Sequence, residues 1–260
     1  MILTSLKNQQ IKHIKQLQAK SKLRVKNHSF VIEGLREVSM ALKYNFKITK
    51  VFVCKDYYKG CIKFSNETEI IEVSKTVYEH LAYRSSTEGI LALACSPLNS
   101  LKDLKIKNKN PLILVLESPE KPGNIGAILR TADAAQVDAV IIANPKTDLY
   151  NPNTIRSSLG AIFSTSLAVG NSEEVYQYLT DLEFHLYAAT LQNSNSYLEE
   201  SYQNSTAFVM GSEANGLTEF WRDKSNIKAI NIPMLGEIDS MNLSVSTAIL
   251  TFEAVRQRQK

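Results

Sequence analysis

The sequence predicts an α/β protein of two domains, a smaller basic one followed by a larger one built on a parallel sheet. Apolar runs of strand length alternate with amphipathic helical segments along the chain. A polar, proline-flanked stretch at residues 96–111 separates two such series. Charge also changes sign there: residues 1–110 carry 20 Lys and Arg against 9 Asp and Glu, whereas residues 111–260 carry 10 against 17. We therefore expect domains over residues 1–105 and 106–260.

The composition is that of a soluble globular protein, with 44% hydrophobic and 22% charged residues. No apolar run approaches the roughly 20 residues that span a bilayer, and the first residues lack the apolar core of a signal peptide. Cys54, Cys61 and Cys95 form no CxxC pair, and the four histidines are scattered singly. We expect reduced thiols, a cytoplasmic location and no metal site.

Helical and strand patterns alternate through the first domain. Ile11, Ile14 and Leu17 recur at three-residue spacing and predict a narrow amphipathic helix over residues 8–20. The later patterns predict strands at 29–34, 48–54, 69–73 and 89–95, and helices at 36–44 and 74–83, the last capped by Ser74. This order of elements predicts a small α/β/α domain.

Residues 1–26 contain seven bases and no acid. A lone charge run is usually a solvated helix face. A whole basic domain joined to an acidic one favours RNA or DNA as a partner, because clustered bases neutralise phosphates and release counterions. The candidate phosphate-binding residues are Lys7, Lys12, Lys15, Lys20, Lys22, Arg24, Lys26 and, in the second domain, Arg156.

The second domain opens with a βαβ unit. Residues 111–119 form the continuous apolar run of a parallel strand buried on both faces. Gly123 and Gly126 begin a helix, and residues 138–143 form the next strand. No acidic residue ends that strand, and neither GxGxxG nor GxxxxGK[ST] is present, so the pattern does not indicate a dinucleotide fold or a P-loop.

Three further stretches, at residues 124–132, 208–217 and 230–249, place polar residues beside glycines. Singly, each has an ordinary structural explanation: Arg130 as a helix-surface arginine, Glu213 as a helix-capping acid, and Ser240 or Asn242 as the N-cap of the last helix.

Together, the three stretches resemble the SpoU (TrmH) family of RNA ribose 2′-O-methyltransferases, within the SPOUT class. The motif N-x-G-x-x-x-R-T-A is met by Asn124, Gly126, Arg130, Thr131 and Ala132. The motif G-x-E-x-x-G-L is met by Gly211, Glu213, Gly216 and Leu217. The third motif, I-P-M-x-G-x-x-x-S-L-N-V-S, is met by Ile232, Pro233, Met234, Gly236, Ser240, Asn242 and Ser244, with Met241 replacing Leu and Leu243 replacing Val. The resemblance covers about residues 111–260, and residues 1–98 are similar to the L30e-like domain that often precedes it.

The resemblance implies S-adenosylmethionine as cofactor, a trefoil knot in the catalytic domain, and a homodimer that completes each site across its interface. Glycines would let the backbone approach the ligand closely, and apolar side chains suit the faces of adenine. The candidate cofactor-binding residues are Gly211, Glu213, Gly216, Ile232, Met234, Gly236, Met241 and Asn242.

The candidate catalytic residues are Arg130, Asn124, Glu213, Ser240 and Asn242. The resemblance places Arg130 at the ribose hydroxyl, where it acts either as a base aided by the RNA phosphate or as an electrostatic clamp. Glu213 would orient Arg130 or Asn124, and Asn124 would cap the helix that carries Arg130. Ser240 and Asn242 would position the nucleotide or shape the knot turn.

Ribosomal RNA is the expected substrate ahead of transfer RNA, because a whole basic domain suits a large structured RNA. A transfer-RNA methyltransferase and a non-catalytic RNA-binding or ribosome-assembly protein on the same fold are the alternatives. A base-methylating relative is a weaker one.

Overall fold

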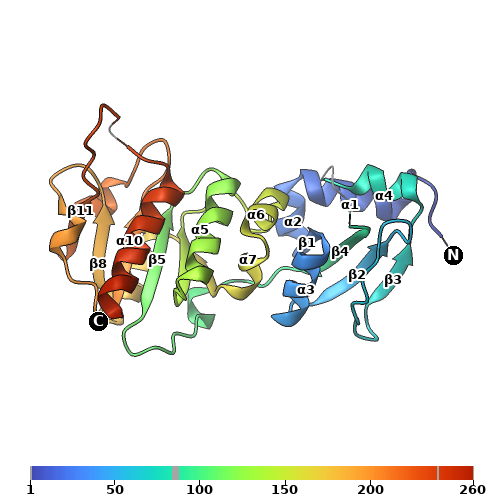
Figure 1. Cartoon of the computed structure of the whole chain (residues 1–260), viewed down its shortest axis with the longest axis horizontal. Helices are drawn as coiled ribbons and strands as arrows, with labels where there is room; N and C mark the ends of the chain where they lie inside the picture. The colour runs from blue at the N-terminus through green and yellow to red at the C-terminus, as the bar shows by residue number, and fades with distance from the viewer. Residues whose placement is uncertain (1, 84–87, 239, 260) are drawn as a thin grey trace. The chain divides into compact units, whose positions relative to one another are not determined.

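The computed structural model describes residues 2–83, 88–238 and 240–259. It divides the chain into two compact units (Figure 1). Unit 1 contains Met1–Leu98 and Asp148–Ser164, and unit 2 contains Asn99–Thr147 and Thr165–Lys260. The expected boundary at residue 105 lies close to the first of these divisions. That residues 148–164 belong to unit 1 was not predicted.

Unit 1 is built on a four-stranded sheet in the order β1-β4-β2-β3. The strands are β1 (Ser29–Glu33), β2 (Ile48–Val53), β3 (Glu69–Glu72) and β4 (Ile90–Cys95), and only β2 and β3 pair in parallel. Side chains of helices α1 (Gln9–Ala19) and α4 (Lys75–Leu81) pack in the hydrophobic core on one face of the sheet. The other helices described before residue 99 are α2 (Ser21–Asn27) and α3 (Leu35–Lys43). Each predicted strand and helix is present, whereas α2 was not predicted.

Local chemistry explains where these helices begin and end. Ile11, Ile14 and Leu17 are buried on α1 as their spacing predicts, and the Asn8 side chain accepts a hydrogen bond from the Gln10 amide at its start. The Ser74 side chain caps α4 in the same way. Helix α2 ends at His28, which adopts a left-handed backbone conformation.

The inserted segment, residues 148–164, packs on the rest of unit 1 through aromatic rings. It contains α6 (Pro152–Ser158) and α7 (Ala161–Ser164). Phe30 of β1 stacks on Tyr150 with ring centroids 4.3 Å apart, and Phe46 meets Phe163 edge-on at 5.0 Å. These rings bury apolar surface that neither part of the chain could cover alone.

A buried ion pair fastens the start of the inserted segment. The Arg24 side chain is only 4% exposed, and its guanidinium donates to both carboxylate oxygens of Asp148, at 3.0 and 2.7 Å. It also donates to the backbone carbonyls of Leu17 and Gln18. The expectation that Arg24 contacts RNA is therefore wrong, because the side chain is buried and four of its five N–H donors face protein acceptors.

Unit 2 is built on a seven-stranded sheet in the order β7-β6-β5-β10-β8-β11-β9, and every described pairing is parallel. Its strands are β5 (Leu112–Glu117), β6 (Ala139–Ala143), β7 (Leu167–Gly170), β8 (His185–Ala189), β9 (Asn195–Ser196), β10 (Thr206–Met210) and β11 (Ile227–Asn231). Its α-helices are α5 (Pro122–Ala134), α8 (Ser172–Asp181), α9 (Glu219–Arg222) and α10 (Leu243–Arg258). The 3₁₀ turns η1 (Leu101–Asp103) and η2 (Tyr197–Glu199) complete it.

Helices cover both faces of this sheet, as the buried run of β5 requires. Helices α5 and α10 lie side by side on one face (Figure 1). Val175 and Leu179 of α8 and Trp221 of α9 belong to the hydrophobic core on the other face. The predicted parallel α/β domain is confirmed, and the trefoil knot stays a prediction.

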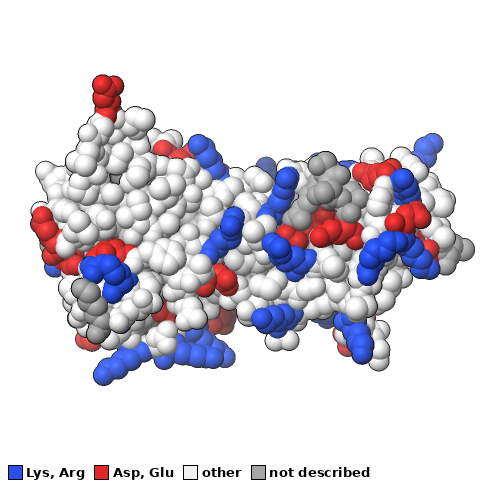
Figure 2. Space-filling view, in the orientation of Figure 1, with Lys and Arg blue, Asp and Glu red and all other residues white. Residues whose placement is uncertain are grey.

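The two units differ in charge less than the two halves of the sequence do. Unit 1 carries 17 Lys and Arg against 9 Asp and Glu, and unit 2 carries 13 against 17. The difference arises because four lysines of the expected linker belong to unit 2. Figure 2 shows Lys and Arg side chains along the lower edge of unit 2.

No helix in the described part of the chain is long and apolar enough to cross a membrane. Cys54, Cys61 and Cys95 form no disulfide. Within the described ranges, no cluster of three His, Cys, Asp or Glu side chains is arranged to hold a metal ion.

We predict that Asp148→Ala destabilises unit 1, because it leaves the buried Arg24 guanidinium without its counter-charge. Removing one partner of a buried ion pair costs about 3 kcal/mol or more. Hydrogen exchange at residues 150–163 measures this local loss as faster exchange. Lys55→Ala is the control, because it breaks an ion pair with Glu72 in which the lysine is 74% exposed. Equal exchange rates in the two variants would show that the Arg24–Asp148 pair does not hold the segment.

Candidate active site

A cavity of about 540 Å³ opens at the carboxyl ends of the parallel strands of unit 2. Its walls come from the segments that follow β8, β10 and β11 and from the start of α10. Strands β5 and β10 are neighbours here, although β6 and β7 continue the sheet on one side and β8 and β11 on the other. Ligands of open α/β sheets bind at such a change of direction, so the cavity lies where the topology predicts a site.

Most candidate cofactor residues line this cavity. They are Gly211, Glu213, Gly216, Ile232, Met234, Met241 and Asn242, and Ser240 lies beside them. Gly236 is not part of the wall, and a side-chain carbon at its position would meet nothing within 4 Å.

The turn after β10 is held by its own backbone. Ser212 and Gly216 exchange two backbone hydrogen bonds of 3.0 Å, and Gly216 has a φ of +65°. A side-chain carbon on Gly211 would lie 2.1 Å from the carbonyl carbon of Gly216. Gly211 is therefore needed so that the chain can close on itself, whereas the sequence analysis attributed the glycines to the approach of a ligand.

Glu213 accepts hydrogen bonds from the loop that leads into α5. The Glu120 amide donates to Oε2 at 3.0 Å, and the Lys121 amide donates to Oε1 at 3.2 Å. The Asn124 side chain donates to Oε1 at 2.7 Å. Burial raises the pKa of this carboxyl, but the hydrogen bonds together outweigh burial and hold the pKa below its ordinary value. Glu213 is therefore a carboxylate whose charge serves the protein's own donors.

The hydrogen bonds continue from Glu213 to the third motif. Asn242 donates from Nδ2 to Oδ1 of Asn124 at 3.1 Å, and its own Oδ1 accepts from the amide of Ser244 at 2.8 Å. Glu213, Asn124 and Asn242 thus form one chain of side chains, which we call the motif bridge. Of the two alternatives for Glu213, the geometry shows contact with Asn124.

Two helix starts differ in how they are capped. Asn242 is the N-cap of α10, as its structural explanation predicts. Asn124, in contrast, lies inside α5, whose N-cap is Lys121 without a side-chain cap. The expectation that Asn124 caps this helix is wrong, because both ends of its amide are engaged by Glu213 and Asn242.

Arg130 lies on α5 but outside the cavity wall. Its side chain is exposed, and it is six residues after Asn124, which is about 9 Å along a helix. None of the hydrogen bonds to Glu213 comes from Arg130 among the described residues. The cavity of one chain therefore lacks the guanidinium that the first motif contains.

Glu117, a buried carboxylate at the end of β5, was not among the predicted site residues. It accepts hydrogen bonds from the Thr218 amide at 2.8 Å, from the Thr218 hydroxyl at 2.7 Å and from the Ser172 hydroxyl at 3.1 Å. These bonds hold the chain directly after Leu217, at the far end of the Gly211 turn. An acid that ends an otherwise apolar buried run was the available signal.

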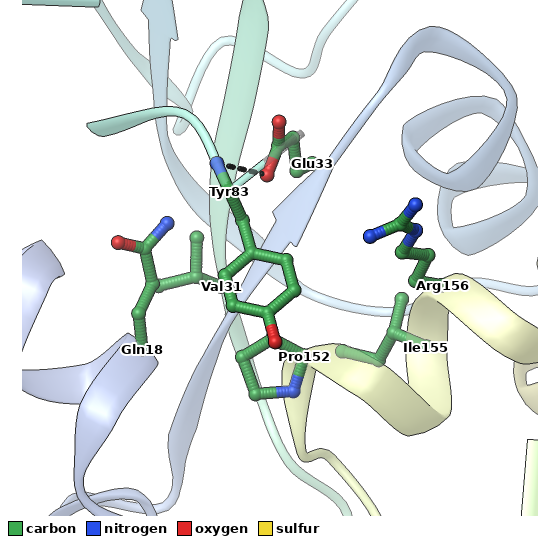
Figure 3. A pocket seen from close by; sticks show the side chains of 7 residues that line it. All are labelled: Gln18, Val31, Glu33, Tyr83, Pro152, Ile155 and Arg156. Carbon is green, nitrogen blue, oxygen red and sulfur yellow. Dashed lines mark hydrogen bonds between the residues drawn. The ribbon is translucent and has the colours of Figure 1, made fainter. Parts of the chain in front are cut away.

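The remaining candidate RNA-binding residues lie in unit 1. Lys15 is half-buried, and the side chains of Lys7, Lys12, Lys20, Lys22, Lys26 and Arg156 are exposed. Arg156 belongs to the inserted segment and borders a small hollow with Glu33 and Tyr83 (Figure 3). The Tyr83 amide donates to the Glu33 carboxylate there at 2.9 Å. At about 10 Å³ this hollow has room for roughly one water molecule and is not a ligand site.

Comparison with known proteins agrees with this architecture. The model of the SpoU rRNA methylase family matches residues 111–252, and that of the MRM3-like substrate-binding domain matches residues 8–92. The 23S rRNA (guanosine(2553)-2′-O)-methyltransferase RlmP of Bacillus subtilis is 29% identical, over 95% of this chain and 96% of its own.

Two solved structures share the whole fold. A crystal structure of an RNA 2′-O ribose methyltransferase is 34% identical, covers 100% of both chains and has a TM-score of 0.82. An AdoMet-bound rRNA methyltransferase from Sinorhizobium meliloti is 26% identical, with a TM-score of 0.88 over 98% of this chain and 97% of its own. The order of the three motifs, the motif bridge and the family match lead to one conclusion: this chain belongs to the SpoU rRNA methylase family.

Proposed function

We propose that this protein is an S-adenosylmethionine-dependent methyltransferase that modifies a ribose 2′-hydroxyl in 23S ribosomal RNA. The observation that carries the proposal is the motif bridge, which joins the three family motifs at the wall of one cavity. The names of the related proteins, which include rRNA 2′-O-methyltransferases and an AdoMet-bound member, support the substrate and the cofactor. Those relatives, which act on ribosomal RNA, also support a cytoplasmic location.

The cavity fits the proposed cofactor in size and chemistry. About 540 Å³ lies within the range of small-molecule sites. Ile232, Met234 and Met241 offer apolar surface, and the described backbone between Ile232 and Met241 forms no hydrogen bond with other described residues. Its amides and carbonyls are therefore available to the edges of adenine and to the ribose. When bound, S-adenosylmethionine supplies a methyl group activated by a sulfonium centre.

The residues of this chain hold the acceptor and assist the loss of its proton. The ribose hydroxyl must lose its proton as its oxygen bonds to the methyl carbon. Arg130 is the motif residue proposed for this step, as a phosphate-assisted base or as a guanidinium that stabilises the developing charge. Asn124 and Asn242 would fix the walls of the cavity, and Ser240, which lines it, would contact the nucleotide.

A homodimer accounts for the position of Arg130. Its exposed side chain would enter the cavity of the partner subunit, so that each site combines one subunit's cavity with the other subunit's arginine. Val245 and Phe252 on α10 are each about half exposed, more apolar surface than a solvated helix needs.

Unit 1 would recruit RNA through the exposed lysines of α1 and α2, and unit 2 would carry out the transfer.

We predict that the protein binds S-adenosylmethionine and that Gly211→Ala abolishes this binding. The added methyl group would overlap the backbone of Gly216 and open the turn. Isothermal titration calorimetry measures the binding of S-adenosylmethionine to the unmodified protein and to the Gly211→Ala variant. NAD is the control ligand. Binding of NAD in place of S-adenosylmethionine would contradict the cofactor assignment.

Glu213→Gln should weaken the motif bridge in a pH-dependent way. The side-chain amide of Gln places an NH₂ donor where the donors to Glu213 need an acceptor. The free energy of unfolding should therefore fall by about 1–3 kcal/mol at neutral pH. Because the pKa of Glu213 lies below its ordinary value of 4.5, its carboxylate stabilises the fold above that pH, and the contribution disappears as the pH falls through the folded-state pKa. Urea unfolding between pH 7 and pH 4 should show the difference from the unmodified protein shrinking toward the acid end.

The exposed Glu237 in the neighbouring loop provides the matched control for that experiment. Glu237→Gln should change stability by less than about 0.5 kcal/mol at either pH. A Glu213→Gln variant as stable as this control at pH 7 would show that the bridge contributes nothing.

Arg130→Ala should abolish methyl transfer while cofactor affinity stays within a few-fold. The loss should appear in kcat more than in KM, since the guanidinium acts in the transition state. Lys at this position should not restore activity, because it lacks the planar fork. Arg36→Ala, at an exposed arginine of unit 1, is the control and should remain active.

Hybrid dimers test whether sites are shared. Co-expressed Arg130→Ala and Gly211→Ala chains should regain activity, because one composite site then contains an intact cavity and an intact arginine. A hybrid as inactive as the two parents would place Arg130 in the cavity of its own chain.

A further inference from the structure

We infer that the lysines of residues 102–109 form a second RNA-binding surface on unit 2, along a segment that runs from β7 to the amino end of β5. We call Lys102, Lys105, Lys107 and Lys109 the lysine strip. This inference rests on the proposed function, because it names a further part of the same RNA substrate that the protein contacts.

The strip is anchored by the residues between its lysines. Leu101, Leu104 and Ile106 are partly buried and pack against the hydrophobic core of unit 2. All four lysines are exposed. The apolar residues thus hold the segment on the unit and leave the lysine side chains outside, which a solvated linker would not do.

Hydrogen bonds fix both ends of the segment. The Val169 amide of β7 donates to the Asn99 carbonyl at 2.7 Å. At the other end, Asn108 donates to Oδ1 of Asp138 at 2.6 Å, and the Leu112 amide donates to Oδ2 of the same carboxylate at 2.7 Å. Because this backbone is already ordered, little further entropy is lost there when a ligand binds.

The charge of the strip is available to a ligand. None of its lysines forms an ion pair with a described residue, and Asp103 is the single acid within residues 102–109. The remainder of unit 2 is strongly acidic, so its positive charge is concentrated in few places. Figure 2 shows Lys and Arg side chains gathered along this lower edge of unit 2. Exposed, unpaired lysines on a fixed backbone bind phosphates through counterion release.

The position of the strip sets the kind of RNA that it would contact. Its last residue leads into the amino end of β5, whereas the cavity lies at the carboxyl ends of the strands. A strand of six residues is about 20 Å long. The end of the strip at Lys107 and Lys109 would therefore bind phosphates about 20 Å from the ribose that is methylated. Such a separation requires a folded RNA larger than a short oligonucleotide.

This contact gives unit 2 a part in RNA binding. Residues 111–260 are acidic, with 10 Lys and Arg against 17 Asp and Glu. With the strip assigned to unit 2, both units contribute phosphate contacts, and RNA affinity is divided between them.

The test replaces Lys105, Lys107 and Lys109 together by Gln, which removes charge and keeps the side-chain stems. The matched control replaces Lys47, Lys59 and Lys63 of unit 1 by Gln, so that net charge changes equally at three other exposed positions. In vitro transcribed, unmodified 23S rRNA is the probe. Its binding is measured by filter retention at several salt concentrations, without cofactor.

The strip variant should bind this RNA roughly tenfold more weakly at 0.15 M salt than the unmodified protein does, and the slope of log K against log salt should become less negative by about 2 to 3. The control should lose less than about threefold. The affinity of the strip variant for S-adenosylmethionine and its kcat at saturating RNA should not change. Unchanged RNA binding in the strip variant, or equal losses in both variants, would overturn the inference.

Failure of the proposed function gives a different result. If the unmodified protein transfers no methyl group to ribose in this RNA, the assigned reaction is wrong. The binding comparison still reports on the strip, because it is made without cofactor or catalysis.

Discussion

The site depends on one carboxylate. Glu213 accepts hydrogen bonds from the loop before α5 and from Asn124, and Asn124 in turn accepts one from Asn242. These residues come from segments about 90 to 120 positions apart in the chain. Glu213 lies in a turn and Asn242 directly precedes α10, so two of the three segments lack regular structure at these residues. Loops with so few internal bonds hold a fixed shape only when outside partners satisfy their polar groups. The motif bridge supplies those partners, and the buried Glu117 does the same for the end of the second-motif turn.

Much of the fold could be predicted because it depends on local periodicity. The spacing of Ile11, Ile14 and Leu17 gave the buried face of α1, and Ser74 gave the start of α4. The continuous apolar run at residues 111–119 gave a strand buried on both faces. In each case the residues that decide the structure are neighbours in the sequence.

What could not be predicted depends on distant partners. Arg24 lies in a run of bases, and only the position of Asp148 shows that it is an internal ion pair. Asn124 precedes a helix-like pattern and resembles a cap, but its partners are 89 and 118 residues away. The lysines of residues 102–109 resemble a linker because their anchors, Leu104 and Ile106, are too few to form a periodic pattern. Within the site, residue types and the order of the motifs predicted which residues line the cavity. The separate roles of Glu213, Asn124 and Gly211 follow only from the contacts in the structure.

The inserted segment has a consequence for how the chain is made. Unit 1 is discontinuous, so translation to Leu98 completes its sheet but not its aromatic core. Tyr150 and Phe163, which cover Phe30 and Phe46, are synthesised some fifty to sixty-five residues later. At ordinary rates of synthesis, several seconds pass with those rings and the Arg24 guanidinium exposed on the nascent chain. Unit 1 therefore cannot finish folding before β5, α5 and β6 of unit 2 have been translated. The two units mature together during biosynthesis, although each has its own sheet.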